Sequence, residues 1–279
     1  MQKTNILQSA EHNTAAPFVE RFALITGATS GIGNGFAHAL ARDGINLVIT
    51  ARNEIRLQEV KNELEARYSI KVKIISRDLS QPEASLDIFE FLKREGVVLD
   101  ILVNNAGFNV YGKFEETDLD EEIKMMNLHV LAVTQLTKLF LKQRSRGADN
   151  MILNVASLAA FVPGPLVSVH FATRAYILSF SQALSNELIG SDVHVTCLCP
   201  GPVKSAFFGR AGMTDVRLAN NKPIKIMDAQ TVADIGYKAM KKRKVIIVPG
   251  YRNKIIAFMA TRIPRALAVR ITRWIMERV

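Results

Sequence analysis

The feature of this sequence that most constrains its fold is a regular alternation of short apolar runs with longer amphipathic segments. The strand-like runs cover residues 22–27, 46–51, 72–78, 99–107, 150–157, 193–201 and 244–250. The helical segments begin near residue 31 and cover 56–68, 85–95, 120–142 and 166–188. Strands that alternate with helices at this spacing form a parallel sheet with helices on both faces. The sequence therefore predicts an α/β fold with a doubly wound parallel sheet.

The chain divides into three parts by composition. Residues 1–20 lack the continuous apolar core of a signal peptide and are interpreted as a flexible N-terminal extension. Residues 21–250 carry the alternating pattern and are long enough to bury one large core, so we expect a single domain there. Residues 251–279 read as a basic amphipathic C-terminal tail. No stretch reaches membrane-spanning length without charged residues.

Charge and cysteine content argue against several classes of function. The formal net charge is +10, but aromatic residues make up 7% of the chain and no RNA- or DNA-binding motif is visible, so no nucleic-acid partner is expected. Cys197 and Cys199 form a C-x-C pair in a strand-like run, a spacing that suits zinc poorly without a second ligand pair. We expect buried thiols, no metal site and a reducing, cytoplasmic location.

A glycine-rich segment, TGATSGIG at residues 26–33, follows the first strand-like run and opens the first helix. Gly27, Gly31 and Gly33 permit a tight turn and a close approach of the backbone to a pyrophosphate, which would face the amino terminus of the helix. Alone this is weak evidence, because a tight turn needs glycine whether or not a ligand binds. Ligands of doubly wound sheets do, however, sit at the carboxyl ends of strands, where this segment lies.

Six motifs, in order and at suitable spacing, resemble those of the short-chain dehydrogenases/reductases. The motifs are TGATSGIG, RDLS with Asp78, NNAG at 104–107, MNLHV with Asn127, NVAS with Ser157 and CPGPVKS at 199–205. The resemblance covers about residues 21–248. It implies a Rossmann-type fold and a nicotinamide cofactor that exchanges hydride with an alcohol or carbonyl compound.

The resemblance also implies which residues hold the cofactor. Asp78 would meet the adenine, residues 104–107 would line the cofactor, and Val203 and Ser205 would hold the nicotinamide amide. A plain strand-ending turn is the alternative for NNAG, since Asn and Gly are common turn residues. The expected cofactor-binding residues are Gly27, Thr29, Ser30, Gly31, Ile32, Gly33, Arg52, Asp78, Leu79, Asn105, Ala106, Gly107, Arg174, Pro200, Gly201, Val203 and Ser205.

The choice between NADP(H) and NAD(H) depends on the residues after the second strand-like run. An acidic side chain there would bind both ribose hydroxyls and repel a 2′-phosphate, but VITARN offers Ala51 and then Arg52. The guanidinium fork of Arg52 suits a phosphate. The alternative is an arginine that merely faces solvent, and the sequence favours NADP(H).

The catalytic signature departs from the family pattern. Most members carry a tyrosine about a dozen residues after the serine and a lysine four positions further on, which places both on one helix face. Counting from Ser157 gives His170 and Arg174 at these positions. The resemblance assigns substrate binding to Ser157, proton donation to the residue at 170, ribose binding and a proton relay to the residue at 174, and support of that relay to Asn127.

The two replacements change the chemistry that we expect. Arg174 can supply charge and hydrogen bonds to the ribose, but a pKa of about 12.5 or higher prevents a guanidinium from passing on a proton. Arg174 and an oxidised nicotinamide would both lower the pKa of His170 from its ordinary value of about 6.5. Neutral His170 would then serve better as the base in alcohol oxidation than as the acid in carbonyl reduction. An NADP(H) preference, which usually accompanies reduction in cells, conflicts with this direction.

Two other functions stay open at this stage. His170 and Arg174 could fill a helix face in a regulatory, cofactor-binding protein that has lost catalysis. His170 could instead be the base of a non-redox lyase or epimerase, which would turn over without any change in nicotinamide absorbance.

The C-terminal region points to an apolar or acyl-type substrate. Residues 206–227 have the mixed composition of a mobile lid, where Phe207 and Phe208 would face an apolar substrate or simply pack beneath the lid. The tail contains seven basic residues and one acidic residue, Glu277. It resembles the endings of family members that reduce long acyl chains. Its apolar residues at helical spacing are Leu267, Ile271, Trp274 and Ile275. The tail is expected to contact an anionic membrane surface peripherally, or to pack on its own domain or on a second subunit of a homo-oligomer.

Overall fold

A parallel sheet forms the centre of the molecule, as the sequence predicts. The computed structural model describes residues 20–204, 209, 211–220 and 226–278. Within this part, seven strands lie in the order β3-β2-β1-β4-β5-β6-β9, and each neighbouring pair is parallel. The strands are β1 Phe22–Thr26, β2 Asn46–Ala51, β3 Val72–Ser76, β4 Ile101–Asn104, β5 Asn150–Val155, β6 Val193–Leu198 and β9 Ile246–Ile247. Residues 1–19 of the expected N-terminal extension, and Ser205, Phe207 and Phe208, lie outside the described residues.

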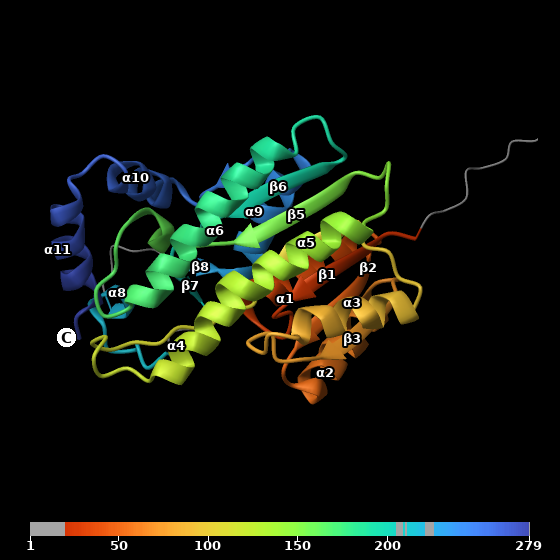
Figure 1. Cartoon of the computed structure of the whole chain (residues 1–279), viewed down its shortest axis with the longest axis horizontal. Helices are drawn as coiled ribbons and strands as arrows, with labels where there is room; N and C mark the ends of the chain where they lie inside the picture. Colours follow the sequence, from red (N-terminus) through yellow and green to blue (C-terminus); the bar gives the residue numbers. More distant parts are fainter. Residues whose placement is uncertain (1–19, 205–208, 210, 221–225, 279) are drawn as a thin grey trace, which may run out of the picture.

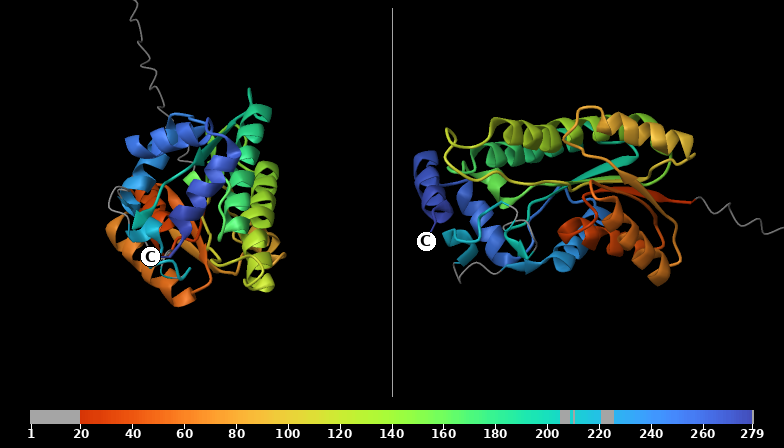
Figure 2. Two further views of the ribbon diagram at one scale, coloured as in Figure 1. Left: turned by 90° about the vertical axis from the view of Figure 1, so that its left-hand side faces the viewer. Right: turned by 90° about the horizontal axis from the view of Figure 1, so that it is seen from below.

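Helices cover both faces of this sheet (Figure 2). One face is covered by α1 (Gly31–Arg42), α2 (Glu54–Arg67) and α9 (Ala229–Lys241), and the other by α3 (Ala84–Arg94), α5 (Val133–Gln143) and α6 (Ser168–Glu187). Side chains of β1 alternate between two cores, with Ala23 and Ile25 in one and Phe22 and Leu24 in the other. The α/β doubly wound fold predicted from the sequence is confirmed.

The strand order reverses at β1, which lies between β2 and β4. In doubly wound sheets a ligand crevice forms at this reversal, outside the carboxyl ends of the strands. Thr26 ends β1 and Asn104 ends β4, and the glycine-rich and NNAG segments begin at these residues. The fold therefore brings two of the sequence motifs to one crevice.

The long helix predicted for residues 120–142 contains a π-helical turn. It begins as α4 (Leu119–Met126), passes through the turn η1 (Asn127–Ala132) and continues as α5. A π turn inserts an extra residue into the helical ladder and changes which side chains share a face. The positions after Met126 therefore deviate from plain helical spacing.

The C-terminal tail folds into two helices at the end of the molecule where the strands finish (Figure 1). These helices are α10 (Tyr251–Ala260) and α11 (Arg265–Met276). Beside them lie α8 (Arg217–Asn220) and a small sheet of β7 (Val203–Lys204) and β8 (Met227–Asp228). Val216 forms a β-bridge with Arg278, which ties the tail to the preceding segment. None of the helices in the described part of the chain is long and apolar enough to cross a membrane.

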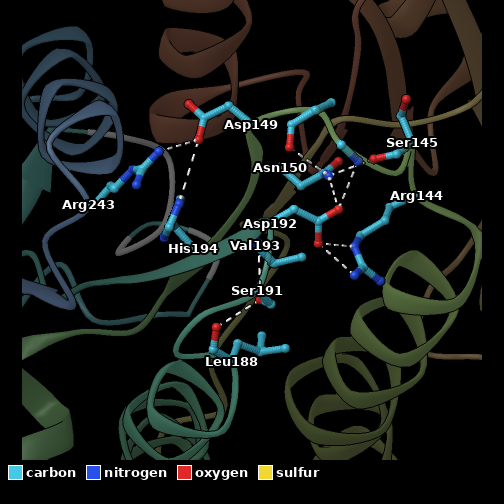
Figure 3. A network of polar contacts seen from close by, with 12 residues as sticks. Arg144, Ser145, Asp149, Asn150, Leu188, Ser191, Asp192, Val193, His194 and Arg243 are labelled. Carbon is cyan, nitrogen blue, oxygen red and sulfur yellow. Dashed lines mark hydrogen bonds and ion pairs between the residues drawn. The ribbon is translucent and has the colours of Figure 1, made fainter.

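A polar network lies at the amino-terminal ends of β5 and β6, at the end of the sheet away from the tail helices (Figure 3). Asp192 accepts hydrogen bonds from Arg144 at 2.7 Å and from Asn150 at 3.3 Å, and Asp149 pairs with Arg243 at 3.2 Å. The Arg144 guanidinium beside Asp192 lowers the pKa of that carboxyl. The network holds the loops that precede β5 and β6. The crevice for a ligand lies at the other end of the sheet, outside the carboxyl ends of the strands.

Candidate active site

The glycine-rich loop adopts a conformation that requires its glycines. Gly27 and Gly31 have φ angles of +67° and +58°, a region that favours glycine. A Cβ atom on Gly33 would lie 2.3 Å from the carbonyl oxygen of Gly27. The loop can therefore bring its backbone close to a ligand only with glycine at these positions.

Hydrogen bonds join this loop to the segment after β4. The side-chain amide of Asn105 donates to the carbonyl oxygen of Thr26 at 2.9 Å. The Thr26 hydroxyl oxygen accepts hydrogen bonds from the backbone N–H groups of Asn105 at 2.9 Å and Ala106 at 3.0 Å. These contacts hold the two segments together at the point where the strand order reverses.

One cavity of about 1320 Å³ runs along the carboxyl edge of the sheet. Most of the residues that the sequence nominates line this cavity. They are Gly27, Thr29, Ser30, Gly31, Ile32, Arg52, Asp78, Leu79, Asn105, Ala106, Gly107, Ser157, His170, Arg174, Pro200, Gly201 and Val203. Gly33 lies behind the loop, Asn127 does not line the cavity, and Ser205 is outside the described residues.

Two arginines, Arg52 after β2 and Arg77 after β3, border the cavity. The guanidinium of Arg77 pairs with Asp87 at 3.1 Å and donates to the carbonyl oxygen of Ser76 at 2.8 Å. Arg52 is exposed and makes no ion pair within the described part of the chain. Of the two, Arg52 is the one whose charge is available to an incoming anion.

A buried cluster of basic side chains, Arg174, His170 and His129, lies beside the cavity. Arg174 is 5% exposed, His170 is 6% exposed and His129 is fully buried. Nη1 of Arg174 donates to the carbonyl oxygen of Val155 at 2.9 Å, and Nη2 lies 2.9 Å from Nε2 of His129. His170 and Arg174 were expected from the sequence, whereas His129 was not.

The contacts of His129 determine its protonation. The hydroxyl of Thr173 donates its single proton to the carbonyl oxygen of His170 at 2.8 Å, so the 2.9 Å contact between this hydroxyl and Nδ1 of His129 requires a proton on Nδ1. Nε2 is then the acceptor for Arg174 and for the backbone N–H of Phe108 at 3.3 Å. Burial and the charge of Arg174 accordingly lower the pKa of His129 well below 6.5. His129 is a neutral imidazole with both nitrogens engaged.

Asn127 lies away from this cluster. Its side-chain amide donates to the carbonyl oxygen of Ser80 at 3.1 Å, whereas His129, two residues later in the π-helical turn, contacts Arg174. The sequence carried one signal for His129: it is a polar residue in a buried stripe that includes Met125 and Leu136. The side chain beside Arg174 is therefore an imidazole and not the expected amide.

Gly107 is the NNAG glycine, and its lack of a side chain makes room for the basic cluster. A Cβ atom at this position would lie 2.4 Å from Nη2 of Arg174 and 2.8 Å from Nε2 of His129. Any larger residue would have to displace the guanidinium or the imidazole. Gly107 thus has a packing role in addition to the turn role expected from the sequence.

The electrostatics of the cluster favour a neutral His170 and a charged Arg174. Burial lowers the pKa of His170 well below 6.5 and the charge of Arg174 lowers it further, partly opposed by a hydrogen bond with the backbone of Phe108. Burial lowers the pKa of Arg174 to about 10, which leaves the guanidinium protonated at neutral pH. His170 is therefore an uncharged imidazole at neutral pH, and Arg174 can attract negative charge.

Ser157 lies two residues after β5 and caps the amino terminus of the short 3₁₀ turn η2 (Leu158–Phe161). Its hydroxyl oxygen accepts the backbone N–H of Ala159 at 3.1 Å. That contact uses an oxygen lone pair and leaves the hydroxyl proton for another acceptor. Ser157 also lines the cavity, so its hydroxyl can donate to a substrate oxygen.

Apolar side chains line the other end of the cavity, and many of them come from the tail. Helix α10 contributes Ile256 and Met259, and α11 contributes Ile271, Ile275 and Met276. The sequence left the tail's position open between a membrane surface, its own domain and a second subunit. Within this chain, its helices pack so that they complete the cavity wall.

Tyr111 ties the tail to the loop after β4. Its hydroxyl donates to the carbonyl oxygen of Met276 at 2.7 Å, and the guanidinium of Arg278 lies 5.4 Å from the centre of its ring. Tyr111 also lines the cavity. The apolar wall is therefore connected to the segment that carries NNAG.

Comparison with known proteins identifies the family. The family model described as short chain dehydrogenase matches residues 21–214. This chain belongs to the short-chain dehydrogenase family. The resemblance drawn from six motifs is confirmed.

Two proteins that are similar to this chain carry names that describe different activities. The chain is 34% identical over 193 residues to the very-long-chain 3-oxoacyl-CoA reductase of Homo sapiens, a match that covers 66% of this chain and 60% of that protein. It is 29% identical over 248 residues to 17-beta-hydroxysteroid dehydrogenase type 3 of Mus musculus, covering 88% of this chain and 76% of that protein. The chain thus spans 60% of the length of the human reductase.

Solved structures of the family share the fold. A short-chain dehydrogenase from Sphingobium yanoikuyae in complex with NADPH has a TM-score of 0.77 to this structure at 27% identity. The match covers 87% of this chain and 93% of that one.

Proposed function

We propose that this short-chain dehydrogenase is an NADP(H)-dependent oxidoreductase that interconverts an apolar alcohol and the corresponding carbonyl compound. The observation that carries the proposal is a single cavity that joins the glycine-rich loop, the Ser157, His170 and Arg174 side chains and an apolar wall. The names of the relatives agree in kind, since they describe a reductase of acyl chains and a dehydrogenase of steroids.

The residues present fit a dinucleotide. The close packing at Gly107 leaves no room for a side chain on the cavity wall, and the positive end of α1 lies at the glycine-rich loop. In the proposal, residues 27–33 hold the diphosphate, and Arg52 holds the 2′-phosphate. Asp78 and Leu79 contact the adenine end, Asn105, Ala106 and Gly107 line the middle, and Pro200, Gly201, Val203 and Ser205 hold the nicotinamide amide.

His170 is proposed as the base of alcohol oxidation. The bound nicotinamide supplies the hydride acceptor, Ser157 donates a hydrogen bond to the alcohol oxygen, and neutral His170 accepts the hydroxyl proton at an imidazole nitrogen. Arg174 hydrogen-bonds the ribose and keeps His170 neutral. Reduction needs imidazolium at His170, which is scarce at neutral pH, so oxidation is the favoured direction.

The proton is proposed to leave His170 through the cavity. The path that the family's lysine would open is closed here, because Arg174 donates to His129, His129 donates to Thr173, and Thr173 donates to the carbonyl oxygen of His170. A guanidinium with a pKa of about 10 also retains its proton at neutral pH. Proton exchange therefore depends on water in the cavity.

Two other functions draw support from the same cluster. The closed hydrogen-bond chain at Arg174 supports a regulatory protein that binds the cofactor without turnover. The neutral base at His170 supports a lyase or epimerase that abstracts a proton without hydride transfer. The experiment described below distinguishes both alternatives from the proposed oxidoreductase.

The proposal includes two statements about partners. Exposed Leu119, Ile123 and Met126 on α4 support assembly into a homo-oligomer, which sedimentation velocity would detect. The surplus of basic residues in the tail supports peripheral contact with an anionic membrane from a cytoplasmic location.

The test begins with fluorescence titration of NADPH and NADH, followed by assays of long-chain secondary alcohols and ketones with both cofactors. We expect tighter binding of NADPH and alcohol-dependent formation of reduced cofactor. Tight binding without turnover would support the regulatory protein, and product formation without a change in nicotinamide absorbance would support the lyase or epimerase. Failure to bind either cofactor would rule out both the oxidoreductase and the regulatory protein.

A further inference from the structure

The apolar end of the cavity reaches the molecular surface at three residues of the tail helices. Ile256, Met259 and Ile271 line the cavity and are also 44%, 55% and 43% exposed. We call these three residues the mouth. An opening rimmed by aliphatic side chains is a poor entrance for a ligand dissolved in water and a good one for a ligand dissolved in lipid.

The surface around the mouth combines apolar and basic side chains. Its exposed apolar residues are Tyr251, Ile255, Phe258, Leu267 and Trp274. Its exposed basic residues are Arg252, Lys254, Arg262, Arg265 and Arg270. We call these ten residues the α10–α11 surface. Exposed apolar side chains together with basic ones on the same helices are typical of helices that lie in a membrane interface.

Negative charge near this surface is already paired. Glu277 lies 3.0 Å from Arg217 and 3.1 Å from Arg273, and Asp215 lies 3.4 Å from Arg278. By contrast, Lys254, Arg265 and Arg270 make no ion pair with any residue that the structure describes. The surface is therefore complementary to an anionic partner.

An anionic bilayer fits these features better than a second copy of the chain. A two-fold dimer through this surface would place the patch that holds Lys254, Arg265 and Arg270 against the same patch of the partner, so that like charges would meet. With 10 residues in α10 and 12 in α11, each helix is too short to span a bilayer. Both helices lie at one end of the molecule, where they can rest on a flat surface together (Figure 1).

We propose that the α10–α11 surface docks on an anionic lipid bilayer and that an apolar ligand passes from the bilayer through the mouth into the cavity. The inference rests on the proposed function only for the apolar character of the ligand. NADPH binding and turnover of a short, water-soluble alcohol test that function separately, because neither requires the bilayer.

Docking can be followed with the native chain, because Trp274 is its single tryptophan. We expect vesicles of phosphatidylcholine and phosphatidylglycerol in equal parts to shift Trp274 emission to the blue at low salt. Brominated lipids should quench this emission, and phosphatidylcholine alone should have little effect. High salt should weaken the binding. An unchanged Trp274 spectrum with the anionic vesicles at low salt would overturn the docking.

A charge-matched pair of variants locates the contact. Arg265→Glu with Arg270→Glu should weaken vesicle binding on the order of tenfold or more, since each basic residue near an anionic surface contributes to the attraction. Lys242→Glu with Lys244→Glu makes the same change in charge just after α9 and should bind nearly as the native protein does. Equal losses in both variants would overturn the assignment to this surface. A change of oligomeric state in the Arg265/Arg270 variant alone would show a subunit interface instead.

Entry through the mouth can be blocked at Met259 of α10, which lines the cavity. The native Cys197 and Cys199 are buried, so a maleimide should react with an introduced surface cysteine. A bulky maleimide on Met259→Cys should slow transfer of a pyrene-labelled long-chain ketone from vesicles to the protein on the order of tenfold. The same label on Lys242→Cys, which lies just after α9 and belongs neither to the cavity lining nor to the α10–α11 surface, should not. Equal rates for the two labelled proteins, or no uptake by the unlabelled variants, would overturn the entry path.

Discussion

Acid should destabilise this protein through two buried histidines. His129 and His170 have pKa values held well below 6.5, mainly by burial and then by the charge of Arg174. Below pH 6.5 the unfolded chain therefore binds protons at these positions that the folded chain does not bind. Their contribution to stability is complete above pH 6.5 and is lost progressively as the pH falls.

The size of the effect follows from the number of protons. Each histidine that is neutral in the folded state and charged in the unfolded state lowers the free energy of unfolding by up to about 1.4 kcal/mol per pH unit. The two together give a limiting slope of about 2.7 kcal/mol per pH unit. Between pH 6.5 and 5.5 the loss is about 1 kcal/mol for each histidine, because the unfolded state is only partly protonated at the start.

Urea unfolding followed by circular dichroism at several pH values measures this slope. His129→Gln and His170→Gln should each remove about one proton from the difference between the two states, whatever they do to stability at pH 8. His38 and His194 remain in both variants, so the change in slope isolates the buried pair. If the two variants keep the slope of the native protein, neither histidine is held neutral in the fold.

Three further predictions concern the cavity. Arg52→Asp should weaken NADPH binding on the order of tenfold or more, because a charged hydrogen bond is replaced by repulsion. In the same fluorescence titration, NADH should bind as tightly as before or more tightly. An unchanged preference for NADPH would show that another residue contacts the phosphate. Replacement of His129 should separate its two contacts, because Gln can still reach Arg174 whereas Asn cannot. In urea unfolding, His129→Asn should therefore lower the free energy of unfolding by about 1.5–3 kcal/mol more than His129→Gln does. Equal stability of the two variants would contradict the contact between His129 and Arg174. His170→Tyr with Arg174→Lys should raise carbonyl reduction at neutral pH, because tyrosine and lysine are the acid and the relay of the family pattern. No gain would show that the pocket has diverged elsewhere.

Much of the cavity could be predicted from sequence because a parallel sheet collects the ends of its strands. The segments after β1 and β4 are 78 residues apart at Thr26 and Asn104, yet the strand order places them side by side. Once the alternation of strands and helices was recognised, motifs at strand ends had to meet at one edge. Ser157, His170 and Arg174 lie at the end of β5 and on the helix that follows it, so they meet there as well.

His129 escaped prediction because its position depends on a backbone irregularity. Motif spacing pointed to Asn127, but the π-helical turn aims the residue two positions later at Arg174. The role of the tail escaped prediction for another reason. Its helical periodicity gives an apolar face without saying what that face covers, and the contact of Met276 with Tyr111 joins residues 165 positions apart. Neither contact is specified by a local pattern.

The most direct test of His170 as a base is alcohol-dependent reduction of NADP⁺ by the native protein and by His170→Ala across the pH range, with NADPH binding measured for both. Because the pKa of His170 lies well below 6.5, the native rate should change little through neutral pH and fall only in acid. His170→Ala should bind NADPH normally and lose on the order of a hundredfold or more in rate. A His170→Ala variant that binds NADPH and oxidises the alcohol with the native rate and pH profile would contradict the proposed chemistry.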